Sequence, residues 1–333
     1  MPGDGFLDRL LDLVSVHDRI IVVGQMDTGK STLIKNLADH MDAYVLDADI
    51  GQNDIGPPSA VWLGKRAEGQ YEAIDGYFCG STSPSGHFLQ VIAGVTRLVQ
   101  SCKKRSILVN TTGLATGPIG RTLKTEKINA IRADLVIGLQ TADELNYLYA
   151  FAHAGSEVAM FRPHPLVTSR SRTQRAEIRG SAYRAHFKGA SVRHCRLDEV
   201  YVERSLLNNG VAADLARLQA VDPGIVHAES LDDEALIVST GPLEDPGRIA
   251  RHMQAGTIYE FRPSDFCGAL TGLLSDSGKL LALGIVDSID FGSGTIDVFT
   301  KAERFSVMQF GSIRLDRADF GSAGAFGPHR SYP

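Results

Sequence analysis

The sequence predicts an α/β protein in which a doubly wound parallel sheet is followed by a small β domain. Short apolar strands alternate with helical stretches between residues 19 and 161, and a glycine-containing stretch, VVGQMDTGKSTL, follows the first strand. After about residue 225, short apolar runs are separated by Gly, Asp and Ser. Strands that alternate with helices form parallel sheets, whereas closely spaced strands usually pair in antiparallel fashion.

The spacing of apolar residues predicts each element in turn. Phe6, Leu10, Leu11 and Val14 recur at helical spacing and predict a short helix within residues 1–18. RIIVVG is a continuous β-branched run ended by glycine, which is typical of a strand buried on both faces. Helices are predicted at KSTLIKNLADHM and ADELNYLYAFAHAG, and further strands at AYVLDAD, RSILVNTTG, ADLVIGLQ and EVAMFRP.

The same patterns divide the chain into three parts. Residues 1–18 form the N-terminal helix, residues 19–224 the phosphate-loop domain with a lid at about 165–190, and residues 225–333 a β-rich domain. EALIVSTG, GKLLALGIVDSIDF, GTIDVFTK and FSVMQFGSIRLD supply the strands of that last domain, which we expect to be antiparallel. The final DFGSAGAFGPHRSYP is rich in Gly, Ser and Pro and is predicted to be a flexible tail.

Composition excludes several classes of protein. The 333 residues carry a formal net charge of −5, so the molecule is no uniformly basic nucleic-acid coat and a polyanion site must be local. The four cysteines lack C-x-x-C spacing, which favours reduced thiols over disulfides or a zinc site. The acidic N-terminus resembles no signal peptide, and no apolar run reaches membrane-span length, so we expect a cytoplasmic protein.

The phosphate loop is the strongest single motif. Gly24, Gly29, Lys30 and Ser31 fit G-x-x-x-x-G-K-[ST], with a strand before the loop and a helix after it, as in P-loop NTPases. The backbone N–H groups of residues 25–30 point at phosphate in such a loop, the lysine bridges β- and γ-oxygens, and the serine hydroxyl binds Mg²⁺. The predicted nucleotide-binding residues are Gly24, Gln25, Met26, Asp27, Thr28, Gly29, Lys30, Ser31 and Thr32.

Polar residues follow the next strand in VLDADIGQND. Asp47 and Asp49 alternate along this strand, so both can face the phosphates, and Gln52 lies just beyond them. A carboxylate there can hold Mg²⁺ or accept a proton from an attacking group. A polar cap at the strand end is the alternative interpretation.

Two further loops are candidates for the substrate side of the site. Ser81, Thr82 and Ser83 in YFCGSTSPSGH offer hydroxyls and backbone N–H groups to a phosphodiester, although a plain turn-rich connection fits as well. Asn110, Thr111 and Thr112 end the strand in VNTTG. Ligand loops of open parallel sheets lie at the carboxyl ends of strands, so these residues belong on the same rim as the phosphate loop.

An arginine-rich segment follows the last predicted core strand. Residues 162–196 hold nine Lys or Arg and a single acid, Glu177. Arg175 and Arg179 share a face if the segment is helical, with Arg170 and Arg172 before them. Guanidinium groups on a lid can neutralise a phosphoryl group during transfer, whereas a solvated helix or an RNA-backbone grip explains the same charge.

Together, GQMDTGKSTL, DADIGQNDIGPP, YFCGSTSPSGH, VNTTG and RSRTQRAEIR resemble the polynucleotide 5′-hydroxyl kinase family in order and separation. That family includes kinases linked to pre-mRNA cleavage, tRNA splicing and ribosomal RNA processing, and shorter archaeal counterparts. The resemblance covers roughly residues 19–200, and the β-rich tail is similar to the C-terminal domain of the shorter members. It implies phosphoryl transfer from ATP or GTP, with Mg²⁺, to the 5′-hydroxyl of RNA or DNA, and RNA-processing proteins as partners.

The resemblance also implies roles for individual residues. Lys30 and Ser31 match the residues that bind phosphate and Mg²⁺. Asp49 matches the general base and a metal ligand, and Gln52 matches the partner residue beside that base. The loop with Ser81, Thr82 and Ser83 matches the clasp on the substrate backbone. Arg170 and Arg175 match the lid arginines, with Arg172 and Arg179 as the other two candidates.

The chain departs from the family pattern at one informative position. Members often carry a tryptophan directly after the NTTG-like motif, where it stacks on the terminal base, and Leu114 stands there in this sequence. Stacking on an aromatic ring is worth about 1–3 kcal/mol per base, so Leu114 predicts either weaker nucleic-acid binding or altered base recognition. About 18 residues precede the first strand, where eukaryotic members carry a whole domain, so we expect a different surface around the donor nucleobase.

Two other functions remain compatible with the motifs. A nucleotide-dependent switch or assembly factor needs the phosphate loop but not Asp49, the 81–83 loop or the lid arginines. No N-K-x-D motif follows the core strands, which disfavours a GTPase. A small-molecule kinase on the same scaffold is the second alternative, and Leu114 in place of tryptophan gives it some weight.

Overall fold

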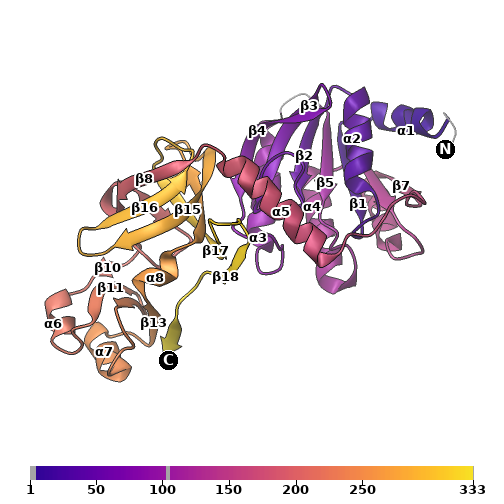
Figure 1. The fold of residues 1–333 in the computed structure, drawn as a ribbon. Coiled ribbons are helices and arrows are strands. Elements are labelled where there is room, and N and C mark those ends of the chain that lie inside the picture. The colour runs from indigo at the N-terminus through magenta and orange to yellow at the C-terminus, as the bar shows by residue number, and fades with distance from the viewer. Residues whose placement is uncertain (1–4, 103–105, 333) are drawn as a thin grey trace. The chain divides into compact units, whose positions relative to one another are not determined.

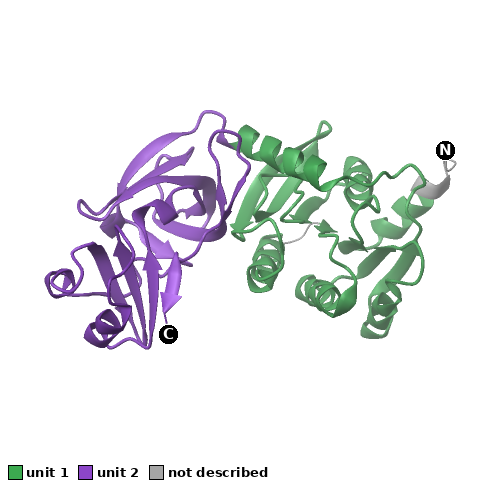
Figure 2. Cartoon of the chain, turned by 60° about the horizontal axis from the view of Figure 1, so that its bottom comes forward, with its two compact units in different colours: residues 1–186 green, residues 187–333 purple. Residues whose placement is uncertain are grey.

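The computed structural model describes residues 5–102 and 106–332 of the chain. It divides into two compact units, an N-terminal unit of residues 1–186 and a C-terminal unit of residues 187–333 (Figure 2). No helix among the described residues combines the length and the apolarity needed to span a membrane.

A seven-stranded sheet with the order β4-β3-β2-β5-β1-β6-β7 organises the N-terminal unit. The five strands from β2 to β7 in this order are parallel, as predicted, and β3 and β4 add an antiparallel hairpin at one edge. This hairpin was not predicted from the sequence. The strands are β1 (Arg19–Gly24), β2 (Tyr44–Ala48), β3 (Ala60–Ala67), β4 (Gln70–Phe78), β5 (Ile107–Thr111), β6 (Leu135–Leu139) and β7 (Glu157–Phe161).

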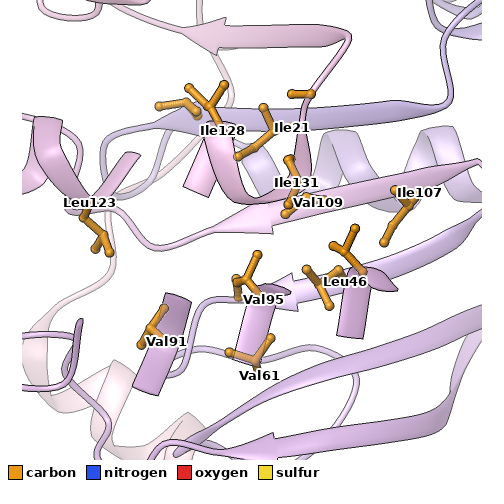
Figure 3. Close-up of a cluster of buried hydrophobic side chains, with 14 of the residues drawn as sticks. Ile21, Leu46, Val61, Val91, Val95, Ile107, Val109, Leu123, Ile128 and Ile131 are labelled. Atoms are coloured by element: carbon orange, nitrogen blue, oxygen red, sulfur yellow. The ribbon is translucent and has the colours of Figure 1, made fainter. Parts of the chain in front are cut away.

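Helices cover both faces of this sheet (Figure 1). Alternate residues of β1 point to opposite sides, so Ile20 and Val22 pack in one cluster with helices α1 and α2, and Ile21 and Val23 in another with α3, α4 and η1. Figure 3 shows the second cluster, in which Val95 of α3 and Ile131 of α4 lie among strand residues. The helices are α1 (Gly5–Ser15), α2 (Lys30–His40), α3 (Phe88–Ser101), α4 (Gly117–Ile131) and the 3₁₀ helix η1 (Asn146–Ala154).

This arrangement places the predicted motifs at one edge of the sheet. The phosphate loop follows β1, the VLDADIGQND stretch ends β2, and VNTTG ends β5, and these three strands are adjacent and parallel. Their carboxyl ends therefore meet on one rim. Helix α5 (Arg172–Phe187) occupies the arginine-rich segment, which was predicted as the lid.

The C-terminal unit contains two packed sheets. One is five-stranded with the order β10-β11-β12-β13-β19, and the other has the order β18-β17-β14-β15-β16-β8, with β9 also pairing with β17. Leu236 and Phe261 of the first sheet share a core with Leu273 and Phe310 of the second, while Ile249 of α7 packs on the opposite face of the first. The bounds are β8 (Ser191–Arg196), β9 (Tyr201–Glu203), β10 (Val211–Ala212), β11 (Ile225–Leu231), β12 (Glu234–Ser239), β13 (Thr257–Phe261), β14 (Ala269–Leu274), β15 (Leu280–Asp290), β16 (Thr295–Thr300), β17 (Val307–Leu315), β18 (Ser322–Ala325), β19 (Arg330–Tyr332), η2 (Leu197–Glu199), α6 (Leu215–Gln219), α7 (Pro246–Met253) and α8 (Pro263–Phe266).

Three features of this unit differ from the sequence analysis. The unit begins at residue 187 instead of 225, because β8 pairs with β16 and β9 with β17. The pairing is not purely antiparallel, since β12–β13 and β9–β17 are parallel. The predicted flexible tail is instead held in two strands, because β18 pairs with β17 and β19 with β13.

Candidate active site

The phosphate loop connects the buried strand β1 to the first turn of α2. Gly24 has no room for a side chain, since a Cβ there would lie 2.5 Å from Thr28 Oγ1 and 3.1 Å from the Leu139 carbonyl. Gly29 has a φ of +89°, in the left-handed region that favours glycine. Glycine is thus required at the two positions for different reasons: close packing at Gly24 and a left-handed backbone conformation at Gly29.

Lys30 is folded over its own loop. Its ammonium donates a hydrogen bond to the Gln25 carbonyl at 2.6 Å, and the residue is 7% exposed. Burial lowers the pKa of Lys30, while the nearby carboxylates Asp49, Asp27 and Asp47 act in the opposite direction. The lysine lies among charged groups in the pocket where an anionic ligand would compete for it.

Most predicted site residues border one cavity of about 590 Å³ in the N-terminal unit. Its walls come from the phosphate loop, the β2 and β5 ends, the loop after β4, and the lid segment. The predicted residues in its lining are Met26, Asp27, Thr28, Gly29, Lys30, Ser31, Thr32, Asp49, Gln52, Thr82, Ser83, Thr112, Arg170 and Arg175. Five predicted residues lie outside that lining: Gly24, Gln25, Ser81, Asn110 and Thr111.

The two carboxylates at the end of β2 have different surroundings. Asp47 is 1% exposed and accepts hydrogen bonds from the Asp49 and Asp54 backbone N–H groups and from Asn110 Nδ2. Burial, with the charges of Asp54 and Asp49, raises the pKa of Asp47 to about 8. Asp49 borders the cavity, and its Oδ1 accepts from the N–H groups of Gly51 and Gln52. Asp47 therefore braces the loop, and Asp49 is the one of the two carboxylates that borders the cavity.

Asn110 connects the phosphate loop to β2 without bordering the cavity. Its Nδ2 donates to Asp47 Oδ1 at 3.1 Å and lies 3.3 Å from Ser31 Oγ. Thr111 is fully buried, and its hydroxyl donates to the Val22 carbonyl between β5 and β1. These contacts give Asn110 and Thr111 a supporting position behind the cavity wall.

The oxygen atoms near Ser31 suit a magnesium ion that is shared with phosphate. The Ser31 hydroxyl and the carboxylate of Asp49 both border the cavity, and hard oxygen donors are the ligands that Mg²⁺ prefers. Among the described residues, no group of three or more His, Cys, Asp or Glu side chains is arranged to hold a metal ion. This donor set fits Mg²⁺ held by a few protein oxygens together with substrate phosphates.

The loop after β4 approaches the carboxylate loop closely. A Cβ on Gly51 would lie 2.6 Å from the Thr82 carbonyl, so only glycine permits this approach without a backbone shift. Thr82 and Ser83 border the cavity, whereas Ser81 is buried and its Oγ accepts a hydrogen bond from the Ser83 N–H. Ser81 shapes the loop, and its two neighbours present polar atoms to the cavity.

The lid arginines reach the cavity from two places: Arg170 precedes α5, and Arg175 and Arg179 lie within it. Arg175 pairs with Asp27 of the phosphate loop, and Arg170 Nη1 lies 3.4 Å from Gln52 Oε1. Gln52 Nε2 in turn donates to the Arg175 carbonyl at 3.2 Å. Of the two further candidates, Arg179 borders the cavity and Arg172 does not.

Several contributing residues were not predicted from the sequence. Asp27 was expected only as part of the phosphate loop, yet its carboxylate also accepts the Arg170 backbone N–H. The Tyr183 hydroxyl of α5 lies 2.6 Å from Ser59 Oγ, both residues being buried. The Ser59 carbonyl accepts from the N–H groups of Cys79 and Gly80, so Ser59 joins the lid helix to the loop after β4. No local pattern marks these partners, which lie far apart in sequence.

Apolar side chains border the cavity beside these polar groups. Leu114 is 37% exposed and Met26 64% exposed, and a Cβ on the intervening Gly113 would contact Met26. Leu166 of the lid segment is also exposed and borders the cavity. The cavity thus combines a polar side, formed by the phosphate loop and its neighbours, with exposed aliphatic surface at Leu114.

Comparison with known proteins adds an independent finding. Residues 24–189 match the family described as mRNA cleavage and polyadenylation factor CLP1 P-loop. A polyribonucleotide 5′-hydroxyl-kinase of Pyrococcus furiosus is 29% identical over 317 residues, covering 89% of this chain and 87% of that protein. A polyribonucleotide 5′-hydroxyl-kinase of Methanocaldococcus jannaschii is 27% identical over 335 residues, covering 93% of this chain and 91% of that protein.

A solved structure shares the fold. Clp1p, from its complex with Pcf11p, matches with a TM-score of 0.64 and 10% sequence identity, covering 93% of this chain and 79% of that chain. At this level of identity the likeness concerns the fold alone.

Proposed function

Because residues 24–189 place this chain in the CLP1 P-loop family, we propose that it is a polynucleotide 5′-hydroxyl kinase. It transfers the γ-phosphate of ATP or GTP to the 5′-hydroxyl of RNA, with DNA as a second acceptor. The observation that carries this proposal is that Lys30, Asp49, Thr82 and Arg175 all border the same cavity. The curated relatives named polyribonucleotide 5′-hydroxyl-kinase, aligned over most of their length, support the same reaction.

The phosphate loop holds the donor in this proposal. Backbone N–H groups of the loop and the N-terminus of α2 bind the β-phosphate, and Lys30 exchanges the Gln25 carbonyl for phosphate oxygens. Ser31 and Asp49 are the residues that would hold Mg²⁺, which supplies positive charge against the β- and γ-phosphates. Asn110 keeps Ser31 in register with β2.

Asp49 activates the acceptor. The 5′-oxygen attacks the γ-phosphorus while its proton passes to the Asp49 carboxylate, and the bond between the γ-phosphorus and the β–γ bridging oxygen breaks to release the nucleoside diphosphate. The N–H groups of Gly51 and Gln52 fix one oxygen of this carboxylate. Thr82 and Ser83 border the same space and hold the acceptor backbone.

The lid arginines neutralise the negative charge on the phosphoryl group during its transfer. Arg170, Arg175 and Arg179 all border the cavity that Lys30 and Asp49 also line. Positive charge aimed at the transferring group stabilises the transition state more than the ground state. The arginines therefore act on the rate as well as on binding.

The direct test is transfer of labelled γ-phosphate from ATP or GTP to an oligoribonucleotide with a 5′-hydroxyl end. The same oligonucleotide with a 5′-phosphate is the matched control, because its acceptor oxygen is blocked. Labelling of the first alone supports the kinase. Nucleotide binding or hydrolysis without labelling would instead indicate an NTPase assembly factor, and labelling of free nucleosides alone would indicate a small-molecule kinase, as the exposed Leu114 allows.

A further inference from the structure

Helix α4 carries two lysines that the reaction described above does not use. Lys124 and Lys127 are both fully buried, although lysine is almost never buried without a partner. They are three residues apart and so lie on one face of the helix. Leu123, Ile128 and Ile131 on the buried side of the same helix belong to the hydrophobic core (Figure 3).

Both ammonium groups end at the backbone of cavity loops. Lys127 Nζ donates to the Ala48 carbonyl at 3.1 Å, and Lys124 Nζ donates to the Thr112 carbonyl and lies 3.2 Å from Thr112 Oγ1. Neither forms an ion pair with a carboxylate in the part of the chain that the structure describes. One helix thus holds the end of β2 and the end of β5 at the same time.

The contact of Lys127 fixes the peptide group that carries Asp49. That peptide consists of the Ala48 carbonyl, held by Lys127, and the Asp49 N–H, which donates to Asp47 Oδ1 at 3.0 Å. Both of its polar atoms are therefore bound by buried side chains, and the Asp49 backbone has little freedom to turn. The charge of Lys127 also acts attractively on Asp49 and Asp47.

This arrangement is costly for stability. Removing an ammonium group from water carries a large desolvation penalty, and well-packed apolar residues of similar volume are often neutral or stabilising replacements. Burial lowers the pKa of both lysines, and in Lys124 the neighbouring Lys127 and Lys30 add to the effect. Proteins keep such unfavourable features, here lysines that are buried without a carboxylate partner among the described residues, mainly at functional sites.

We infer that Lys127 and Lys124 are positioning residues of the phosphoryl-acceptor site, Lys127 by fixing the Ala48–Asp49 peptide and Lys124 by fixing Thr112. The inference rests on the proposed kinase function. Neither lysine touches the substrate, and both act through the loops they hold. Lys127 acts through Asp49, which requires that its effect disappear when the Asp49 carboxylate is absent.

The test is a double-mutant cycle on single-turnover transfer at saturating acceptor. Lys127→Met should lower the rate about 10- to 100-fold, since small misplacements of a reacting group cost this much. Lys127→Gln keeps an N–H donor for the Ala48 carbonyl and should recover part of the loss. Lys124→Met should also reduce the rate, and Lys301→Met, an exposed lysine of the C-terminal unit, serves as the matched control.

The decisive comparison is made in the Asp49→Asn background. In that background, Lys127→Met should change the transfer rate by no more than about twofold, which is the usual error of additivity. In the single mutant Lys127→Met, the nucleotide affinity should also stay within about twofold of the wild-type value. Additive losses in the cycle, or a parallel loss of nucleotide affinity, would reduce the lysine to a general structural role and overturn the inference. A wild-type protein without transfer activity would refute the kinase proposal instead, so the two failures are distinguishable.

Discussion

The Arg175 guanidinium pairs with the Asp27 carboxylate at 2.5 Å, joining the lid helix to the phosphate loop. Both side chains are about one-fifth exposed, at 19% and 21%. Asp27 also accepts the Arg170 backbone N–H, so one carboxylate holds two points of the lid segment. A phosphate group bound in the loop would compete with Asp27 for the same arginine.

Replacing this carboxylate should strengthen nucleotide binding. Asp27→Asn removes a negative charge beside the phosphates and releases Arg175, and asparagine tolerates the positive φ of 55° at this position. Partly exposed pairs are worth about 0.5–1 kcal/mol, which corresponds to about a two- to fivefold tighter Kd. Titration with a fluorescent nucleotide measures the effect, and weaker binding by Asp27→Asn than by the wild type would contradict it.

Lys30→Ala should abolish turnover while the fold remains intact, because the charge that bridges the β- and γ-phosphates is lost. Lys35→Ala is the matched control, since Lys35 lies on the same helix and forms a surface pair with Asp54. Transfer assays with circular dichroism on both variants make the comparison. Full activity in Lys30→Ala would remove the basis for the phosphate-loop assignment.

Asp49→Asn should lower kcat by about 10²–10⁴-fold, the usual contribution of a general base, while nucleotide still binds. Asp47→Asn addresses the other carboxylate, which borders no part of the cavity and braces the loop with hydrogen bonds. Its main effect should be a loss of thermal stability. If Asp47→Asn were inactive at unchanged stability and Asp49→Asn were active, the base would have been assigned to the wrong residue.

At least one of Arg170→Ala and Arg175→Ala should lower kcat at saturating substrate. An arginine that neutralises the transferring phosphoryl group is worth about 10³–10⁵ in rate in related phosphate-loop enzymes. Arg172→Ala is the control, because Arg172 lies in the same segment and does not border the cavity. Raised KM with normal single-turnover rates in both mutants would make the segment a nucleic-acid grip.

The buried Lys127 should give stability a distinct pH dependence. Burial lowers its pKa from 10.5 to about 8, so between these values the unfolded chain binds the extra proton and the folded chain does not. As the pH rises through this interval, the free energy of unfolding of the wild type should therefore increase relative to that of Lys127→Met. The increase should be about 3 kcal/mol for a pKa difference of about 2.5. Urea unfolding followed by the fluorescence of Trp62, the single tryptophan, reports on the N-terminal unit, and a pH-independent difference would contradict the assignment.

The parallel core and its rim of motifs were predictable because the signals are local. RIIVVG is buried at every position after Arg19, and the motif glycines, Lys30 and Ser31 lie within a short stretch of sequence. The hairpin β3–β4 was missed because β4 is largely exposed and lacks a clean apolar alternation. The boundary at residue 187 depends on β8, whose partner β16 begins about a hundred residues later at Thr295.

Contacts between distant residues explain what the sequence left out of the site. Asp27 and Arg175, Ser59 and Tyr183, and Lys127 and Ala48 are each separated by many positions. Their pairing depends on how strands and helices pack, and periodicity within one element carries no trace of it. The phosphate loop and the loops at the ends of β2 and β5 were therefore predictable, and the side chains that hold these loops in place were not.

The last residues of the chain also have a practical meaning for handling the protein. Strand β19 pairs with β13, Tyr332 donates a hydrogen bond to the buried Glu260 carboxylate, and β18 pairs with β17. Trimming this segment would leave rows of unpaired backbone groups on β13 and β17, a ready template for self-association. Solubility tags and immobilisation chemistry therefore belong at the other end of the polypeptide, and a shortened version made to aid crystallisation would precipitate more readily than the full chain.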